Sequence, residues 1–449
     1  MARKVFLSVL GTSFYSKCKY AKAETGFCSA ETRFIQIASL EYNVAKEWNS
    51  SDIGYILITD QSEKDNWHRS ESGKRLRNSF AKEEEAYEWL EDEIESMNLP
   101  FEVKPLKIKD GKNEEEIWDI FEKLYDVIED EDELYIDITH GFRYIPMFMI
   151  VFCNYVKFLK KCTVKKISYG NFETMDKQTR IAPIIDITSF STLQDWTAAS
   201  DEFISTGSVA KLSKLYMPEI KYRLRLSLGE DEGAQALNNF IKKLTTLVNE
   251  LTLCQGKRLI DADSISNSSY SLKEIETIDT LSPFKPLLEK IRTTLDRFDV
   301  NANTKNGIAA AKWCCDNGQY QQAITLLQET IVSMVCEMVG LDWSKEIKRK
   351  YVNIAFITLA DKKIIDGETV VDTPDDKDLL IEERIALIEQ IKTLPIVNDL
   401  KGYFSTLTAY RNKINHGTML EGRQFKNVDN IATSIKDLTN KIFELTYTN

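Results

Sequence analysis

The hydrophobic pattern of this 449-residue sequence changes near residue 196. Before that point, short apolar runs typical of β-strands alternate with segments of helical periodicity, at the spacing of a parallel α/β sheet. Beyond it, strand-like runs largely vanish and long helical patterns take their place. The sequence therefore predicts α/β plus all-α architecture: a Rossmann-like domain with a parallel sheet over 1–195, a linker over 196–215, and an all-helical domain over 216–449.

The elements of both domains can be placed approximately from the same periodicities. Strands are expected at 5–10, 55–58, 101–106, 134–138, around 167 and at 181–187, and helices at 34–45, 117–128, 145–158, 234–254, 307–338 and 395–416. A turn-rich run at 203–208 is the expected connection between the domains. Residues 340–395 are less regular, and we expect them to form an insertion with exposed loops on the helical domain.

Composition limits the classes of function. The formal net charge is −12, which argues against a broad nucleic-acid surface because non-specific affinity for phosphate chains comes mainly from Lys and Arg. Any polyanion site must therefore be local. The eight cysteines show no metal-ligand spacing, so we expect no bound metal. No apolar run approaches the roughly 18 residues of a membrane helix, and no signal-peptide core follows the first residues, so we expect a cytoplasmic protein without a membrane partner.

The run Asp-Ile-Thr-His-Gly-Phe-Arg at 137–143 lies at the end of a strand candidate. The carboxyl ends of strands in open α/β sheets are where ligands usually bind. Hydroxyl, imidazole, backbone and guanidinium donors are offered there by Thr139, His140, Gly141 and Arg143. This set predicts an anionic, nucleotide-like ligand. The alternative is an ordinary strand-to-helix turn whose His and Arg donate to nearby carbonyls.

A second candidate loop follows the first strand. It contains Gly11, Thr12 and Ser13 instead of a G-x-G-x-x-G turn or a Walker A loop, so dinucleotide binding of the usual kind is not predicted. Consecutive ligand loops gather at the switch point of such a sheet, so we expect this loop beside 137–143. Phe14, Tyr15 and Phe142 are candidates for stacking on a base. An ordinary turn is again the alternative.

Near the end of the chain, Arg411 and His416 form an Arg-x-x-x-x-His pattern in a helical segment. Cleavage of RNA by its own 2′-hydroxyl needs a proton acceptor, a proton donor and positive charge beside the phosphorane. Histidine can serve as base or acid, and a guanidinium grips phosphate oxygens with paired donors. The alternative is a surface arginine and a histidine that is stabilised by the helix dipole.

Helix geometry adds an expectation about this pair. Five residues correspond to about 500°, which leaves Arg411 and His416 about 140° apart around the axis. Either the helix end distorts near Gly417, a plausible C′ glycine, or the site is composite. Asn412 and Asn415 lie four residues from His416 and Arg411 respectively, and could position substrate or simply form helix-end hydrogen bonds.

Taken together, these motifs resemble the CRISPR-associated DxTHG-motif proteins, in which a nucleotide-sensing CARF domain is fused to a HEPN ribonuclease domain. The matching residues are 5–12, Asp137, Thr139, His140, Gly141 and 411–416. Residues of about 340–395 match no pattern. The candidate ligand residues are Gly11, Thr12, Ser13, Phe14, Asp137, Thr139, His140, Gly141, Phe142 and Arg143, and the candidate catalytic residues are Arg411, Asn412, Asn415 and His416.

This resemblance implies an endoribonuclease that cleaves single-stranded RNA without a metal in type III CRISPR antiviral defence. It further implies activation by a cyclic oligoadenylate, with cyclic tetra-adenylate favoured and no other cofactor. The expected assembly is a homodimer, or a higher homo-oligomer, in which a cleft holds Arg411, Asn415 and His416 from two chains. Two alternatives stay open at this point. One is a non-catalytic nucleotide sensor that signals to a partner; the other is a sensor that also degrades its ligand, with Thr12, Thr139 or His140 involved.

Overall fold

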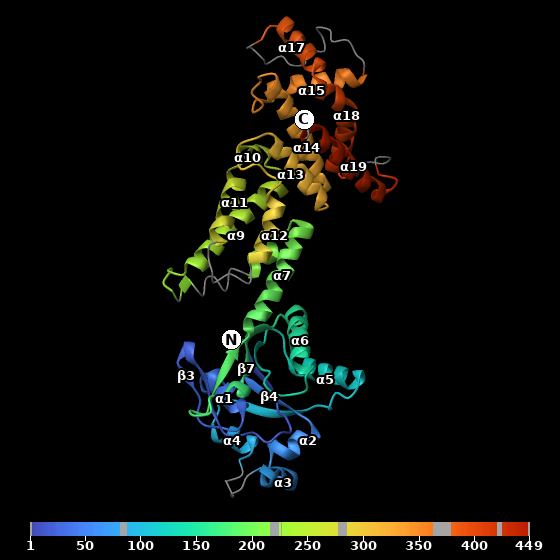
Figure 1. Ribbon diagram of the computed structural model, residues 1–449. Helices are drawn as coiled ribbons and strands as arrows, with labels where there is room; N and C mark the ends of the chain where they lie inside the picture. The colour runs from blue at the N-terminus through green and yellow to red at the C-terminus, as the bar shows by residue number, and fades with distance from the viewer. Residues whose placement is uncertain are drawn as a thin grey trace. The chain divides into compact units, whose positions relative to one another are not determined.

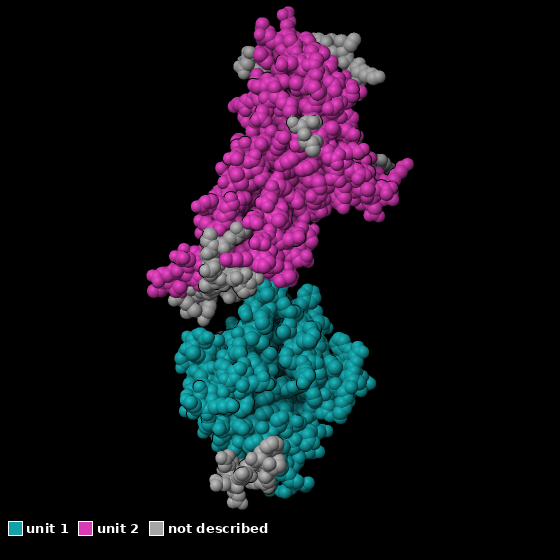
Figure 2. Space-filling view, viewed as in Figure 1, with its two compact units in different colours: residues 1–194 teal, residues 195–449 magenta. Residues whose placement is uncertain are grey.

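The computed structural model describes residues 2–80, 88–215, 224–225, 227–276, 285–361, 379–419 and 424–447. The chain divides into two compact units, which we call the N-terminal unit, Met1–Gln194, and the C-terminal unit, Asp195–Asn449 (Figure 2). The N-terminal unit combines a mainly parallel sheet with helices, whereas the described secondary-structure elements of the C-terminal unit are all helices (Figure 1). The predicted fold class is confirmed.

Within the described residues, the strands of the N-terminal unit form one sheet in the order β3-β2-β8-β7-β6-β1-β4-β5. Strands β7, β6, β1, β4 and β5 are parallel neighbours, whereas β8 runs antiparallel to β7. The strands are β1 (Lys4–Val9), β2 (Lys19–Lys22), β3 (Phe27–Cys28), β4 (Ile53–Ile58), β5 (Glu102–Lys107), β6 (Glu133–Asp137), β7 (Thr163–Gly170) and β8 (Ile181–Asp186). The short strands β2 and β3 were not among the predicted ones.

The order of strands reverses at β1. From β1 the chain proceeds to β4 on one side, while β6 and β7 are added on the other. The adjacent carboxyl ends of β1 and β6 therefore form the switch point of the sheet, where ligands bind in open α/β folds. Both candidate loops, 11–14 and 137–143, begin at these two strand ends.

Helices cover both faces of this sheet (Figure 1). On one face, α5 and α6 pack against Val5 and Leu7 of β1; on the other, α1 and α4 pack beside Phe6. A central strand buried on both faces explains why β1 is apolar nearly throughout. The helices of the unit are α1 (Ile35–Tyr42), η2 (Ala45–Glu47), α2 (Asp60–Ser62), η3 (Glu63–Trp67), α3 (Glu71–Phe80), α4 (Leu90–Ser96), α5 (Glu114–Val127), α6 (Ile145–Leu159), η1 (Ala23–Thr25) and η4 (Phe172–Thr174).

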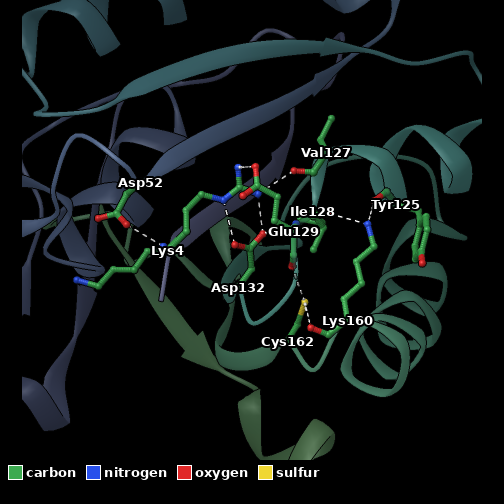
Figure 3. A network of polar contacts seen from close by, with 10 residues as sticks. Lys4, Asp52, Tyr125, Val127, Ile128, Glu129, Asp132, Lys160 and Cys162 are labelled. Carbon is green, nitrogen blue, oxygen red and sulfur yellow. Dashed lines mark hydrogen bonds and ion pairs between the residues drawn. The ribbon is translucent and has the colours of Figure 1, made fainter. Parts of the chain in front are cut away.

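The amino ends of β1 and β6 are joined by paired charges (Figure 3). Arg3 donates to both carboxylate oxygens of Asp132, at 3.0 and 2.7 Å, and contacts Glu129 at 2.7 Å. Lys160 donates to the carbonyls of Tyr125 and Ile128 at 2.6 Å each. These charged side chains at the amino ends of the strands therefore form hydrogen bonds and ion pairs within the protein.

The C-terminal unit is built around α13 and α14, whose side chains are mostly buried. Gly307 allows the two helices to approach closely, since a Cβ there would lie 2.2 Å from the Thr330 hydroxyl. The described helices that lie wholly or partly in this unit are α7 (Thr188–Thr206), α9 (Glu232–Thr252), α10 (Gly256–Asp261), α11 (Asp263–Glu276), α12 (Lys285–Leu295), α13 (Lys305–Asp316), α14 (Tyr320–Met338), α15 (Glu346–Asp361), α17 (Ile381–Thr393), α18 (Pro395–Asn415) and α19 (Val428–Tyr447).

The turn-rich connection predicted at 203–208 is wrong over most of its length. Helix α7 continues to Thr206, and the boundary between the two units falls within it. Trp196, Ala199 and Phe203 are all buried and recur at helical spacing, so they form an apolar stripe on α7. This stripe outweighs the small polar residues that suggested a turn, and only Gly207, with a φ of 70°, ends the helix.

The described parts of 340–395 belong to the helical core instead of forming exposed loops upon it. Tyr351 and Phe356 of α15 are buried, as are Ile388 and Ile391 of α17. The Phe356 ring stacks on Phe404 of α18 with 4.0 Å between centroids. Their apolar spacing was diluted by charged neighbours, which hid the two helices in the sequence. The loop candidates at 362–377 lie outside the described residues.

Candidate functional sites

Asp137 ends β6 and is fully buried. Its carboxylate accepts a hydrogen bond from the Ser8 hydroxyl of β1 at 2.6 Å and another from the Thr139 backbone N–H at 3.2 Å. Burial raises the pKa of Asp137, and these hydrogen bonds act against that rise. Of the predicted ligand residues, Asp137 thus joins two strands and shapes the following loop, and its carboxylate has no exposed surface for a ligand.

Thr139 and Gly141 fix the course of this loop. The Thr139 hydroxyl donates to Asp137 and accepts from the backbone N–H of Gly170 at 2.7 Å, which ties the loop to the end of β7. Gly141 has a φ of 118°, and a Cβ there would lie 3.1 Å from a Val9 methyl. Only glycine fits that conformation and that space. Phe142 and Arg143 beyond it are exposed at the entry to α6.

Asn66 fixes the loop after β1. Its side-chain amide donates to the carbonyls of Gly11 and Ser13 at 2.9 and 3.0 Å. Thr12 and Ser13 are exposed, and Phe14 is half-buried beneath the Arg33 guanidinium, 5.0 Å from its ring centroid. The hydroxyl and backbone groups of this loop therefore face solvent while its base is fixed.

The two loops meet through a pair of rings. Tyr15 stacks on His140 with 4.3 Å between centroids and 23° between planes. The structure thus brings together two loops that are far apart in the sequence, as expected from the sequence. Asn66 and Ser8 were missed by sequence reasoning. A polar residue inside the apolar run of β1 was a usable signal for Ser8, whereas Asn66 had no local signal.

His140 is the most unusual titratable group here. Its Nε2 atom is buried and has no hydrogen-bond partner in the structure. Burial lowers the pKa of His140 to about 4, so the imidazole is neutral near pH 7. A buried ring nitrogen without a partner is costly, and such groups cluster at functional sites. The site therefore holds a neutral imidazole whose Nε2 atom is buried in this structure.

The second candidate site lies at the carboxyl end of α18. Gly417 adopts a left-handed conformation with a φ of 63°, and the Thr418 N–H bonds back to the Lys413 carbonyl at 3.2 Å. The prediction of a C′ glycine is confirmed. Asn412, Asn415 and His416 are all exposed around this helix end.

Arg411 is held against α14. Its guanidinium contacts Glu329 at 3.0 Å and donates to the side-chain oxygen of Gln328 at 3.3 Å. The other carboxylate oxygen of Glu329 contacts Arg349 at 2.7 Å. Helix α18 stays α-helical through Asn415, so Arg411 and His416 remain offset by about 140° around its axis. A distortion that aligns both side chains within one chain is not observed.

Part of the N-terminal unit matches a known family model. Residues 5–173 match the family model described as "CRISPR system endoribonuclease Csx1, CARF domain". This segment is a CARF domain. The predicted resemblance to CARF-containing CRISPR-associated proteins is thereby confirmed, and both candidate loops lie inside the matched range.

Two further proteins are similar to this chain. CRISPR-associated protein MJ1674 of Methanocaldococcus jannaschii is 26% identical over 243 residues, which cover 52% of this chain but only 34% of that protein. Csm6 of Enterococcus italicus, solved with cyclic hexa-2′-fluoro-hexa-dAMP bound, aligns over 100% of this chain and 95% of its own at 12% identity, with a TM-score of 0.41. The match to MJ1674 thus spans about a third of that relative's length.

Two searches concern the described residues only. No helix in them is both long and apolar enough to cross a bilayer. No three His, Cys, Asp or Glu side chains among them are grouped as metal ligands would be.

Proposed function

We propose that this protein is an endoribonuclease that is activated by a cyclic oligoadenylate and cleaves single-stranded RNA in type III CRISPR defence. The observation that carries the proposal is the match of residues 5–173 to the CARF domain of a CRISPR endoribonuclease, in a chain that also carries Arg411 and His416 at a helix end. The CARF domain is the sensing part, and the C-terminal unit is a HEPN-type nuclease.

The ligand site suits a ring of phosphates and adenines. Thr12, Ser13 and Arg143 are exposed and supply hydroxyl and guanidinium donors for phosphate oxygens. The loop leads directly into α6, whose amino terminus favours negative charge. Phe142 is 44% exposed and offers an aromatic face for a base. Cyclic tetra-adenylate is the ring we favour.

The chemistry proposed for the C-terminal unit needs no metal. The 2′-oxygen of the substrate attacks the adjacent phosphorus as His416 accepts its proton, and the bond from phosphorus to the 5′-oxygen breaks as a second imidazole returns a proton to that oxygen. The products are a 2′,3′-cyclic phosphate and a 5′-hydroxyl. Arg411 stabilises the negative charge that develops on the phosphorane oxygens. DNA lacks the attacking hydroxyl, so RNA alone is cut.

Two protomers would complete this site. The offset between Arg411 and His416 argues that one helix does not supply both groups to one phosphate, whereas two helix ends in a dimer do. An exposed apolar stripe on α6 supports association: Met147, Val151 and Phe158 lie on one side of that helix and are 75%, 62% and 84% exposed. Unpaired apolar surface of this kind commonly marks an interface between proteins. We therefore propose a homodimer.

The test is RNA cleavage with a fluorescent single-stranded substrate in chelator, with and without cyclic tetra- or hexa-adenylate. The wild type should cleave only with activator. His416→Ala should lose about 100-fold or more of the rate, because general acid-base catalysis contributes that much. Lys401→Ala, at an exposed position on the same helix, is the matched control and should cleave normally. Unchanged cleavage by His416→Ala would overturn the assignment of His416 as the catalytic base. Absence of cleavage by the wild type with either activator would favour a non-catalytic sensor.

The neutral His140 favours a second activity, slow degradation of the cyclic ligand in the CARF domain. The imidazole is neutral, and a ligand that opens the Tyr15–His140 stack would expose the buried Nε2 so that it could accept a proton from a ribose 2′-hydroxyl. Labelled cyclic tetra-adenylate should then give linear products with His416→Ala but not with His140→Ala. Products that disappear in His416→Ala would instead assign degradation to the C-terminal unit.

A further inference from the structure

Arg411 and Thr408 lie one helical turn apart on the same side of α18. Gln328 of α14 contacts both of them. Its amide nitrogen donates to the Thr408 hydroxyl at 2.9 Å, and its amide oxygen accepts from the Arg411 guanidinium at 3.3 Å. One side chain of the neighbouring helix therefore connects the guanidinium to a second point on α18.

The hydroxyl of Thr408 sets the direction of this chain of hydrogen bonds. It donates its one hydrogen to the Phe404 carbonyl within α18, at 2.9 Å, so toward Gln328 it can only accept. The amide nitrogen of Gln328 must therefore face Thr408. The amide oxygen then faces Arg411, whose guanidinium offers donors and no acceptor. Both partners thus favour the same orientation of the amide.

Burial distinguishes this contact of Arg411 from its ion pair with Glu329. Gln328 is only 6% exposed, whereas the side chain of Glu329 is 44% exposed. Water and salt ions weaken an exposed ion pair, but they have little access to a buried amide. Gln328 is therefore better placed than Glu329 to hold the guanidinium in one orientation.

We propose that Gln328 is a positioning residue for Arg411 and that Thr408 fixes the orientation of Gln328. This inference rests on the proposed ribonuclease function, in which Arg411 stabilises the charge that develops on the phosphorane. A guanidinium has five N–H groups, so the contacts with the protein do not exhaust its donors. Stabilisation of a transition state depends on donors that are already in place, so loss of this hold should slow the chemical step.

Activator-stimulated RNA cleavage by Gln328→Leu is the first test, because leucine fills a similar volume but makes neither hydrogen bond. Its kcat should fall by about 10- to 100-fold, with the KM for RNA changed less than about twofold, since the lost interaction acts in the transition state. Thr408→Val should lower kcat by about threefold or more, because the amide keeps its oxygen but loses its fixed orientation. Thr408→Ser retains the hydroxyl and should restore the rate.

Thr406→Val is the matched control. The Thr406 hydroxyl makes the same kind of bond within α18, to the Gly402 carbonyl at 3.1 Å, but this side chain is exposed. Thr406→Val should therefore cleave RNA at the wild-type rate. Circular dichroism of each variant shows whether it folds, and Thr408→Val takes the place of Gln328→Leu in the next comparison if the latter does not.

The Arg411→Ala background separates positioning from a general effect on the fold. Single-turnover cleavage keeps the loss of about 100- to 1,000-fold expected for Arg411→Ala measurable. In that background, Gln328→Leu should change the rate by less than about twofold, because the group that it positions is already gone. A merely structural role would lower the rate by the same factor with and without Arg411.

Equal losses in the two backgrounds, or a wild-type rate in Gln328→Leu, would overturn the positioning role. A wild-type rate in Thr408→Val alone would overturn the part assigned to Thr408. A wild type that cuts no RNA with either activator would instead overturn the ribonuclease assignment.

Discussion

The two candidate sites hold their polar groups in opposite ways. In the CARF domain, Asp137 and the ring nitrogen of His140 are buried, and their loops are fixed by hydrogen bonds and ring stacking. In the C-terminal unit, His416 and its asparagine neighbours are exposed at a helix end. Buried polar groups are expensive unless satisfied, whereas exposed ones cost little. Changes in the first site should therefore alter folding and function together, and changes in the second should alter function alone.

The largest stability difference is expected between Asp137→Ala and His416→Ala. Removal of the Asp137 carboxylate leaves the Ser8 and Thr139 donors buried without their acceptor, which should cost about 2–4 kcal/mol in the free energy of unfolding. His416→Ala removes an exposed ring and should cost less than about 0.5 kcal/mol. Urea unfolding of the full chain, followed by circular dichroism, measures both. Equal losses would break the comparison.

The second largest effect is expected in the pH dependence of stability, to which His140 should contribute and His416 should not. The pKa of His140 is about 4 in the folded protein and near its ordinary value of 6.5 in the unfolded chain, so between these values the unfolded chain binds more protons. Stability should thus rise with pH across this window and level off above it, by at most about 3 kcal/mol in total. His140→Asn should lose this rise, and His416→Asn should retain it.

The measured quantity is the difference between each variant and the wild type at pH 4.5 and 7. Burial raises the pKa of Asp137, so that carboxyl favours the folded state at low pH and opposes the His140 effect. Because Asp137 is present in all three proteins, its contribution cancels in the difference. A His140→Asn difference that does not change between these pH values would contradict a neutral, buried imidazole.

Each site contains a glycine with a positive φ, and replacing the two glycines should give a smaller difference in stability between the sites. Gly141→Ala combines an unfavourable φ of 118° with a contact of 3.1 Å to Val9, and should cost about 1–3 kcal/mol. At Gly417 the φ is 63° and an added Cβ would lie 3.6 Å from Met419 Cγ, an ordinary van der Waals contact, so Gly417→Ala should cost only about 1 kcal/mol. Thermal unfolding of the two variants side by side gives the ranking. A larger loss at Gly417 would reverse it.

The sequence could predict features that depend on neighbouring residues, but not contacts between distant segments. The six longer strands and the helices α1, α5, α6, α9, α13, α14 and α18 were recoverable because their apolar spacing is local. The C′ role of Gly417 could be proposed from chain order alone. The partners of the sites are not local. Asn66 beneath the Gly11 loop, the Tyr15–His140 stack and the Glu329 contact of Arg411 each join segments that only the folded chain brings together. Sequence patterns therefore located the two loops and the helix end, but not what holds them.

The smallest expected effect concerns Glu329, which bridges Arg411 and Arg349 on the surface of α14. Its side chain is 44% exposed, and exposed ion pairs contribute about 0–1 kcal/mol. A double-mutant cycle of Glu329→Gln with Arg411→Gln should therefore give a coupling free energy below about 1 kcal/mol in urea unfolding, and less at high salt. Glu329→Gln alone should leave Arg411 in contact with Gln328. A coupling above about 2 kcal/mol would mean that this site is held as firmly as the CARF loops, since only desolvated pairs reach that value.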